Sequence, residues 1–178
     1  MNTNNESSSP FAESYWVIPG RFLAGEHPGA AGEKVLQKRI QALLRTGVNI
    51  YYDLTENLDG RRNYANLLYS EAIEYEMNVE YHNFPLEDLK APSIETVKVI
   101  LNSIDQNLAA QKIIYIHCYA GIGRTGTIVG CYLARHGISG LAALNELANL
   151  RQNLPSWYHR SPEMPDQVEL VTGWPEGR

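Results

Sequence analysis

The sequence predicts a single α/β domain with a central, mostly parallel sheet flanked by helices. Short runs rich in β-branched and aromatic residues alternate with longer segments in which apolar residues recur at helical spacing. This alternation is typical of parallel sheets whose strands are connected by helices. The chain has 178 residues, of which 44% are apolar and 20% are charged, and this composition suits one soluble globular domain with its own core.

The expected elements cover most of the chain. Strands are expected at residues 15–18, 21–24, 48–54, 79–84 and 113–117. Helices are expected at residues 33–46, 64–75, 94–108, 124–136 and 139–153. Ser93 is placed to cap the third helix, and Gly47 to end the first.

The two ends of the chain are polar or rich in proline. Residues 1–12 are rich in Asn and Ser, so they are expected to be a disordered lead-in to a domain at 13–178. They contain no apolar stretch typical of a secretory signal. The tail from Leu154 contains four prolines, and one helical turn is expected between them.

Composition argues against several classes of partner. The net charge of −5 gives no support for general binding to nucleic acid or to an anionic membrane, and no stretch approaches a membrane span. The five histidines and two cysteines show no metal-ligand spacing, so we expect neither metal nor cofactor. Cys118 and Cys131 do not suggest a disulfide framework, and a free thiol fits the cytoplasm.

The most informative segment is 113–127, I-I-Y-I-H-C-Y-A-G-I-G-R-T-G-T. A short apolar strand ends at His117, a turn containing glycines follows, and a helix begins near Arg124. Glycines at 121, 123 and 126 allow backbone N–H groups to converge on one point. The helix N-terminus adds further N–H groups and the positive end of its dipole. The segment therefore predicts a cradle for a phosphoryl group.

Four side chains in this segment suit nucleophilic catalysis. Cys118 would lie at the floor of the cradle, where the N–H groups and Arg124 favour its thiolate. Arg124 presents a planar fork that can hold two phosphoryl oxygens. Thr125 can donate a hydrogen bond to the sulfur. His117 can fix the loop by hydrogen bonding, with the alternative that it only ends the strand. A lone cysteine at a strand end would usually be core packing, but the spacing of these residues argues for a nucleophile.

The motif H-C-Y-A-G-I-G-R-T-G resembles the phosphate-binding loop of the protein tyrosine phosphatase superfamily. The short chain and the late position of the loop resemble the dual-specificity branch. The resemblance implies a cysteine phosphatase fold and a protein-tyrosine or dual-specificity phosphatase that works through a phosphocysteine intermediate. It implies that the phosphate is bound by Cys118, Tyr119, Ala120, Gly121, Ile122, Gly123 and Arg124.

The family mechanism also implies a carboxylic acid upstream of the cysteine, which protonates the leaving oxygen. The segment F-P-L-E-D-L-K-A-P, residues 84–92, resembles the acid loop of small dual-specificity members, and Asp88 is the matching residue. Glu87 is the adjacent alternative. Asp53, at the end of an expected strand, is a further alternative, although a structural role suits it better.

Two other residues have open roles. Cys131 lies among apolar residues of the helix that follows the cradle, so core packing is expected, with a redox partnership as the alternative. Gln167 could contact the attacking water, as polar residues in this region do in some relatives.

The cradle itself contains no lysine, whereas family members that act on polyphosphorylated inositol lipids tend to have one there. A phosphorylated protein is therefore the expected substrate. An inositol phosphate or another small phosphate ester is the alternative, and a non-catalytic phospho-binding module is a third hypothesis. Phosphate, sulfate and vanadate are expected to inhibit.

Overall fold

The computed structural model describes residues 8–56, 64–138 and 140–177. In this part of the chain a five-stranded sheet has the order β1-β2-β5-β3-β4. The strands are β1 (Ser14–Ile18), β2 (Phe22–Gly25), β3 (Ile50–Asp53), β4 (Glu80–Asn83) and β5 (Ile114–His117). Only β1 is antiparallel to its neighbour, so the expected mostly parallel sheet is confirmed.

The four parallel strands end in one row. Gly25 of β2 and Asp53 of β3 both pair with His117 of β5, and Asn83 of β4 pairs with Asp53. The segments that leave these strands therefore emerge side by side at the carboxyl edge of the sheet. In open α/β sheets this edge is where ligands bind.

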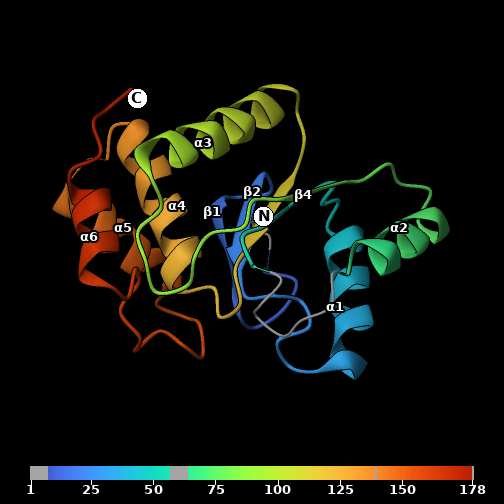
Figure 1. The fold of residues 1–178 in the computed structure, drawn as a ribbon. Coiled ribbons are helices and arrows are strands. Elements are labelled where there is room, and N and C mark those ends of the chain that lie inside the picture. The colour runs from blue at the N-terminus through green and yellow to red at the C-terminus, as the bar shows by residue number, and fades with distance from the viewer. Residues whose placement is uncertain (1–7, 57–63, 139, 178) are drawn as a thin grey trace, which may run out of the picture.

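Helices cover both faces of the sheet (Figure 1). The helices are α1 (Glu33–Arg45), α2 (Ala65–Glu74), α3 (Ile94–Ala109), α4 (Gly123–Arg135), α5 (Leu141–Arg151) and α6 (Pro165–Thr172). Helices α1 and α2 pack on one face, and α3 to α6 form a larger layer on the other. No helix within the described ranges is long and apolar enough to span a membrane.

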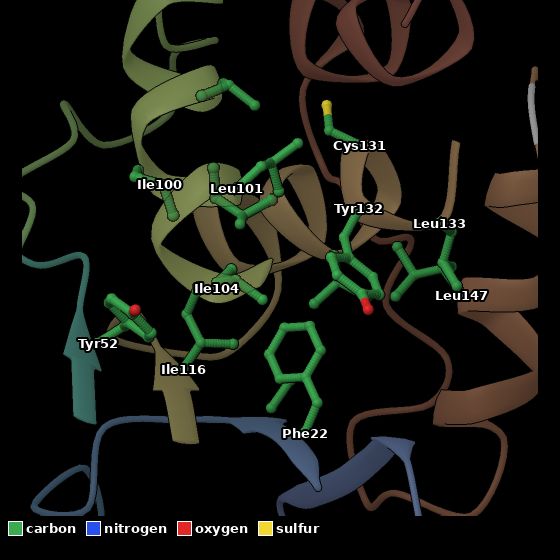
Figure 2. Close-up of a cluster of buried hydrophobic side chains, with 14 of the residues drawn as sticks. Phe22, Tyr52, Ile100, Leu101, Ile104, Ile116, Cys131, Tyr132, Leu133 and Leu147 are labelled. Atoms are coloured by element: carbon green, nitrogen blue, oxygen red, sulfur yellow. The ribbon is translucent and has the colours of Figure 1, made fainter. Parts of the chain in front are cut away.

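Helix α4 lies at the centre of the larger layer. It is buried from Gly123 to Ala134 and packs against α3, α5 and α6. Figure 2 shows part of this core, where side chains of α3 and α4 meet Phe22 and Ile116 of the sheet. Cys131 is fully buried in this cluster, as the prediction of core packing requires.

The proline-rich tail contains more helix than the one expected turn. Helix α6 spans eight residues, because Pro165 occupies its first turn, where a proline N–H would have no partner in any case. The Gln167 side chain also accepts a hydrogen bond from the backbone N–H of Met164 at 3.2 Å, which caps the helix start. Pro175 follows the helix, so the prolines bound it without interrupting it.

The expected lead-in at 1–12 falls partly within the described residues, which begin at residue 8. Phe11 packs edge-on against Tyr115, with 5.9 Å between ring centroids. The Arg39 guanidinium lies over the same ring at 4.7 Å. The packed part of the chain therefore includes Phe11. Residues 1–7 of the lead-in lie outside the described residues.

Candidate active site

The predicted cradle connects β5 to α4. Cys118 directly follows the strand and is 3% exposed, and the helix begins at Gly123. Gly121 has a φ of 70°, and a Cβ there would lie 2.5 Å from the carbonyl carbon of Gly25. Only glycine fits this position, because the loop turns closely against the end of β2. Tyr119 and Ala120 are exposed at the mouth of the turn.

Arg124 reaches from the first turn of α4 to the loop that follows β4. Its side chain is 1% exposed. Nη2 lies 3.1 Å from Oδ1 of Asp88, and Nη1 donates to the carbonyl oxygen of Leu86 at 3.2 Å. We call residues 85–92 the acid loop. The guanidinium thus brings the acid loop to the Cys118–Arg124 turn.

Of the two adjacent carboxylates, Asp88 faces the cradle. Glu87 instead pairs with Lys90 at 2.5 Å, and both of these side chains are largely exposed. The Asp88 side chain is 53% exposed, so it contacts solvent while it pairs with Arg124. The structure therefore places Asp88, and not Glu87, beside the arginine.

Helix α6 holds the far end of the acid loop. The Asp166 carboxylate accepts a hydrogen bond from the backbone N–H of Ala91 at 2.8 Å. The buried Gln167 side chain donates to the carbonyl oxygen of Lys90 at 3.1 Å. The amide of Gln167 therefore fixes the loop, and its contact with the attacking water stays a prediction.

His117 is fully buried behind the cradle. Nε2 lies 2.8 Å from the hydroxyl of Tyr64, and Nδ1 lies 3.1 Å from the carbonyl oxygen of Cys118. Burial lowers the pKa of His117; the Asp53 carboxylate opposes this change and the Arg124 charge adds to it, and the pKa remains below its ordinary value. Through Nδ1 the imidazole contacts the backbone at the nucleophile, and its role in fixing the loop stays a prediction.

Asp53 supports this arrangement from the end of β3. One carboxylate oxygen accepts from the backbone N–H and the hydroxyl of Thr55 at 2.8 and 2.6 Å. The other accepts from the Tyr81 hydroxyl at 2.6 Å. Burial raises the pKa of Asp53, but the His117 imidazole and these hydrogen bonds outweigh burial and hold the pKa below its ordinary value. Both oxygens are occupied, so the geometry suits positioning and not proton transfer.

Thr125 differs from its prediction. Its hydroxyl is fully buried, and within the described residues it has no hydrogen-bond partner, so the expected bond to the Cys118 sulfur is not formed. A buried hydroxyl without a partner is unfavourable in a folded protein.

Several contacts of the site were not predicted from the sequence. The backbone N–H of His27 donates to the carbonyl oxygen of Tyr119 at 2.9 Å, and the His27 ring lies edge-on to His117. Ser161 donates to the carbonyl oxygen of Ile122 at 2.7 Å. These residues come from segments far from the cradle in the sequence, and no local pattern marks them.

A family model described as a DSP-PTPase phosphatase of polymorphic toxin systems matches residues 28–138, more than half of the chain. The chain belongs to this DSP-PTPase phosphatase family. The match covers both the acid loop and the Cys118–Arg124 turn, and it confirms the predicted membership of the tyrosine phosphatase superfamily.

Individual relatives agree with this family. The chain is 28% identical over 123 residues to human dual specificity protein phosphatase CDC14A. These residues make up 68% of this chain but 19% of that protein. It is 42% identical over 73 residues to the phosphatidylglycerophosphate phosphatase PTPMT2 of Arabidopsis thaliana, 40% of this chain and 31% of that protein. The chain thus spans less than a third of the length of these two relatives.

Solved structures show the same fold. The crystal structure of Tk-PTP in its active form superposes with a TM-score of 0.67 over 90% of this chain and 95% of that chain, at 21% identity. This likeness confirms the cysteine phosphatase fold predicted for the DSP-PTPase chain.

Proposed function

We propose that the chain is a cysteine-dependent phosphomonoester hydrolase, a protein-tyrosine or dual-specificity phosphatase acting through a phosphocysteine intermediate. The observation that carries the proposal is the ion pair between Asp88 and Arg124. It puts an acid beside the arginine of a Cys-x5-Arg turn, and family membership gives the reaction class.

In the first step the Cys118 thiolate attacks phosphorus, and the bond from phosphorus to the leaving oxygen breaks. Arg124 binds two phosphoryl oxygens, which replace the Asp88 carboxylate on its guanidinium. Asp88 must then be protonated, and its proton goes to the leaving oxygen. The product is a neutral alcohol and a phosphocysteine.

In the second step water attacks the phosphocysteine, and Asp88 accepts its proton. The bond between sulfur and phosphorus breaks, and the thiolate and inorganic phosphate are released. The role we propose for Thr125 is a hydrogen bond to the departing thiolate, a bond that is not formed in the structure without substrate. His117 and Asp53 act as positioning residues, because they hold the backbone behind Cys118.

The substrate we propose is a phosphorylated protein, because the phosphate-binding turn, Cys118 to Arg124, carries no lysine. The second candidate is a small phosphate ester or a phospholipid headgroup. This candidate is supported by the 42% identity, over 73 residues, to a protein named as a phosphatidylglycerophosphate phosphatase. A non-catalytic phospho-binding module is the weakest hypothesis, since such a module would need no thiolate.

The further features of the proposal follow from this chemistry. The thiolate and Arg124 do the work of a metal ion, so no metal or cofactor is needed. Phosphate, sulfate and vanadate would compete for the same donors. We place the protein in the cytoplasm, where the thiol stays reduced, and assign no nucleic-acid or membrane partner.

The test measures turnover of p-nitrophenyl phosphate in the presence of EDTA. A rapid-mixing experiment then follows the first turnover of enzyme with this substrate. We expect a burst of one nitrophenolate per active site in the wild-type chain, inhibition by vanadate, and no turnover by Cys118→Ser. Turnover by Cys118→Ser at a comparable rate, or loss of activity on chelation, would contradict the mechanism. A panel of phosphopeptides, inositol phosphates and phosphatidylglycerophosphate then separates the two substrate classes.

A further inference from the structure

A groove lies between α5 and the segment that follows it. Its volume is about 440 Å³. Its lining includes Leu141, Leu144 and Ala148 of α5 and Trp157, Tyr158 and Arg160 of the following segment. We call this surface the α5 groove. Of its lining residues only Ser161 contacts the phosphate-binding turn, so the catalytic site does not account for the rest of the groove.

Large apolar side chains are exposed along the α5 groove. Trp157 is 64% and Tyr158 is 69% exposed, and their rings meet edge-on with centroids 6.4 Å apart. Leu141, at the start of α5, is also largely exposed. Clustered exposed apolar groups mark interaction surfaces more often than scattered ones do. Tryptophan, tyrosine and arginine are the residues most enriched among the energetic anchors of such surfaces.

The groove is also positively charged, although the chain as a whole carries −5. Arg160 is exposed and makes no ion pair within the described residues. Arg151 lines the groove from beneath and is 2% exposed. Its guanidinium donates to the carbonyl oxygen of His159 and to the hydroxyl of Ser156, not to a carboxylate. No aspartate or glutamate lines the groove among the described residues.

The α5 groove reaches the catalytic turn through Ser161. Ser161 belongs to the groove lining, and its hydroxyl donates to the carbonyl oxygen of Ile122 at 2.7 Å. A Cβ on Gly126 would lie 2.1 Å from the same hydroxyl oxygen, so the segment packs directly on the start of α4. The groove therefore lies next to the first turn of α4, the turn that carries Arg124.

We propose that the α5 groove binds the segment of a substrate protein that flanks the phosphorylated residue, and that it selects segments with an apolar residue and acidic neighbours. The aromatic and leucine side chains match the apolar residue, and the exposed Arg160 matches the carboxylates. This inference rests on the proposed phosphatase activity and extends it to the sequence around the phosphorylated residue.

The experiment compares kcat/KM for phosphotyrosine and phosphothreonine peptides that contain one leucine and either Asp and Glu or the isosteric Asn and Gln as neighbours. In the wild-type chain we expect a roughly three- to fivefold preference for the acidic peptides, the range of an exposed ion pair. The preference should weaken at 0.5 M NaCl, because salt screens exposed charges.

Matched variants locate the effect. Arg160→Gln should bring the ratio of acidic to amide peptides close to one, whereas Lys38→Gln, an exposed lysine on α1, should keep the wild-type ratio. Trp157→Ala should lower kcat/KM on the leucine-containing peptides by about tenfold, the loss expected of an aromatic anchor. Tyr69→Ala, which changes an exposed tyrosine on α2, is the control for this change.

The inference and the phosphatase proposal fail separately. Equal kcat/KM on acidic and amide peptides, or an acidic preference that survives Arg160→Gln, would overturn the groove assignment. Neither result affects turnover of p-nitrophenyl phosphate by the wild-type chain, which has no flanking residues and tests the chemistry alone. If that turnover were absent, anisotropy with the same peptides and Cys118→Ser would still measure whether the groove prefers acidic segments.

Discussion

Oδ1 of Asp88 lies 3.1 Å from Nη2 of Arg124, although Asp88 belongs to the loop after β4 and Arg124 to the first turn of α4. In this arrangement a carboxylate occupies part of the fork that a phosphoryl group would use. In the proposed mechanism, substrate binding would exchange one anion for another on the same guanidinium. Asp88 would then lie next to the leaving oxygen, and the ion pair would order the acid loop before the substrate arrives.

Replacement of the acid should affect substrates unequally. We expect Asp88→Asn to slow a phosphopeptide by about 10²–10⁴-fold, because its alkoxide or phenolate needs a proton. p-Nitrophenyl phosphate should be slowed less in formation of the phosphocysteine, since nitrophenolate leaves readily. The basic limb of the pH–rate profile should flatten in the variant.

Two neighbouring carboxylates are the controls for this prediction. Glu87→Gln should behave like the wild type, because Glu87 pairs with Lys90 away from the cradle. Suppose that Asp53→Asn lost the basic limb of the pH–rate profile while Asp88→Asn kept both its rate and this limb. The general acid would then be Asp53, at the end of β3. Vanadate binding by each variant checks that the cradle is folded.

Arg124→Lys should lose activity by roughly 10²–10³-fold, nearly as much as Arg124→Ala. A lysine cannot reproduce a fork that reaches both Asp88 and Leu86 and that binds two phosphoryl oxygens. Arg135→Lys, at the opposite end of α4 and paired with Asp105, should remain active. Steady-state kcat/KM measures the effect, and near-normal activity of Arg124→Lys would show that two-pronged binding is unnecessary.

The two thiols should react differently with iodoacetate. Burial raises the pKa of Cys131 to about 12, so its reactive thiolate is scarce at neutral pH. The native chain should take up one label per molecule, at Cys118, and phosphate or vanadate should block it. In urea both cysteines should react. Peptide mass spectrometry distinguishes the sites, and labelling of native Cys131 would contradict the burial found here.

Gly121→Ala should abolish vanadate binding and lower the free energy of unfolding by at least about 2 kcal/mol. The added methyl group would combine a positive φ with a close approach to the backbone of Gly25. Gly32→Ala is the matched control, because Gly32 has a φ of 103° but no atom lies within 4 Å of its added Cβ. Gly32→Ala should lower the free energy of unfolding only by the cost of the positive φ, and it should retain full activity. Urea denaturation and vanadate titration measure the two outcomes.

The buried His117 should make stability depend on pH. Its pKa is lowered in the folded state, so the unfolded chain binds more protons below about pH 6.5. The free energy of unfolding should therefore fall as the pH decreases from 7.5 to 5.5, by at most about 1.4 kcal/mol per pH unit from this residue.

His117→Gln removes this titration. The variant should show a shallower pH dependence of its urea midpoint, whatever its stability at pH 7.5. The Asp53 carboxylate does not interfere in this window, because its lowered pKa places its own effect below about pH 4. An equal slope in wild type and variant would assign the pH dependence to other groups.

The central part of the molecule could be predicted because its signals are local. The apolar run before Cys118 and the glycines after it define a strand, a turn and a helix without reference to the rest of the chain. The segment that places Asp88 beside Arg124 was predictable for the same reason, since it is short and has its own pattern, and the role of Asp88 as the acid stays a prediction. Strand and helix bounds agree with the structure to within a few residues.

The supporting contacts were not predictable, because they join residues that are distant in the sequence. Tyr64 and Tyr81 look like ordinary core aromatics until the sheet brings them to His117 and Asp53. The hydrogen bond from Gln167 to Lys90 depends on α6, a helix whose full length was not predicted because the segment around it is rich in proline. A proline at the first turn and one inside a helix look alike in composition, but only the second breaks the helix.

The burial of α4 from Gly123 to Ala134 couples catalysis to the integrity of the whole molecule. The helix that carries Arg124 cannot detach unless α3, α5 and α6 separate from it and the largest part of the interior opens to water. Loss of catalytic activity and cooperative unfolding are then the same event. On slow heating, residual turnover would report the fraction of intact molecules, so a colorimetric assay could replace calorimetry when variants are ranked by thermal resistance.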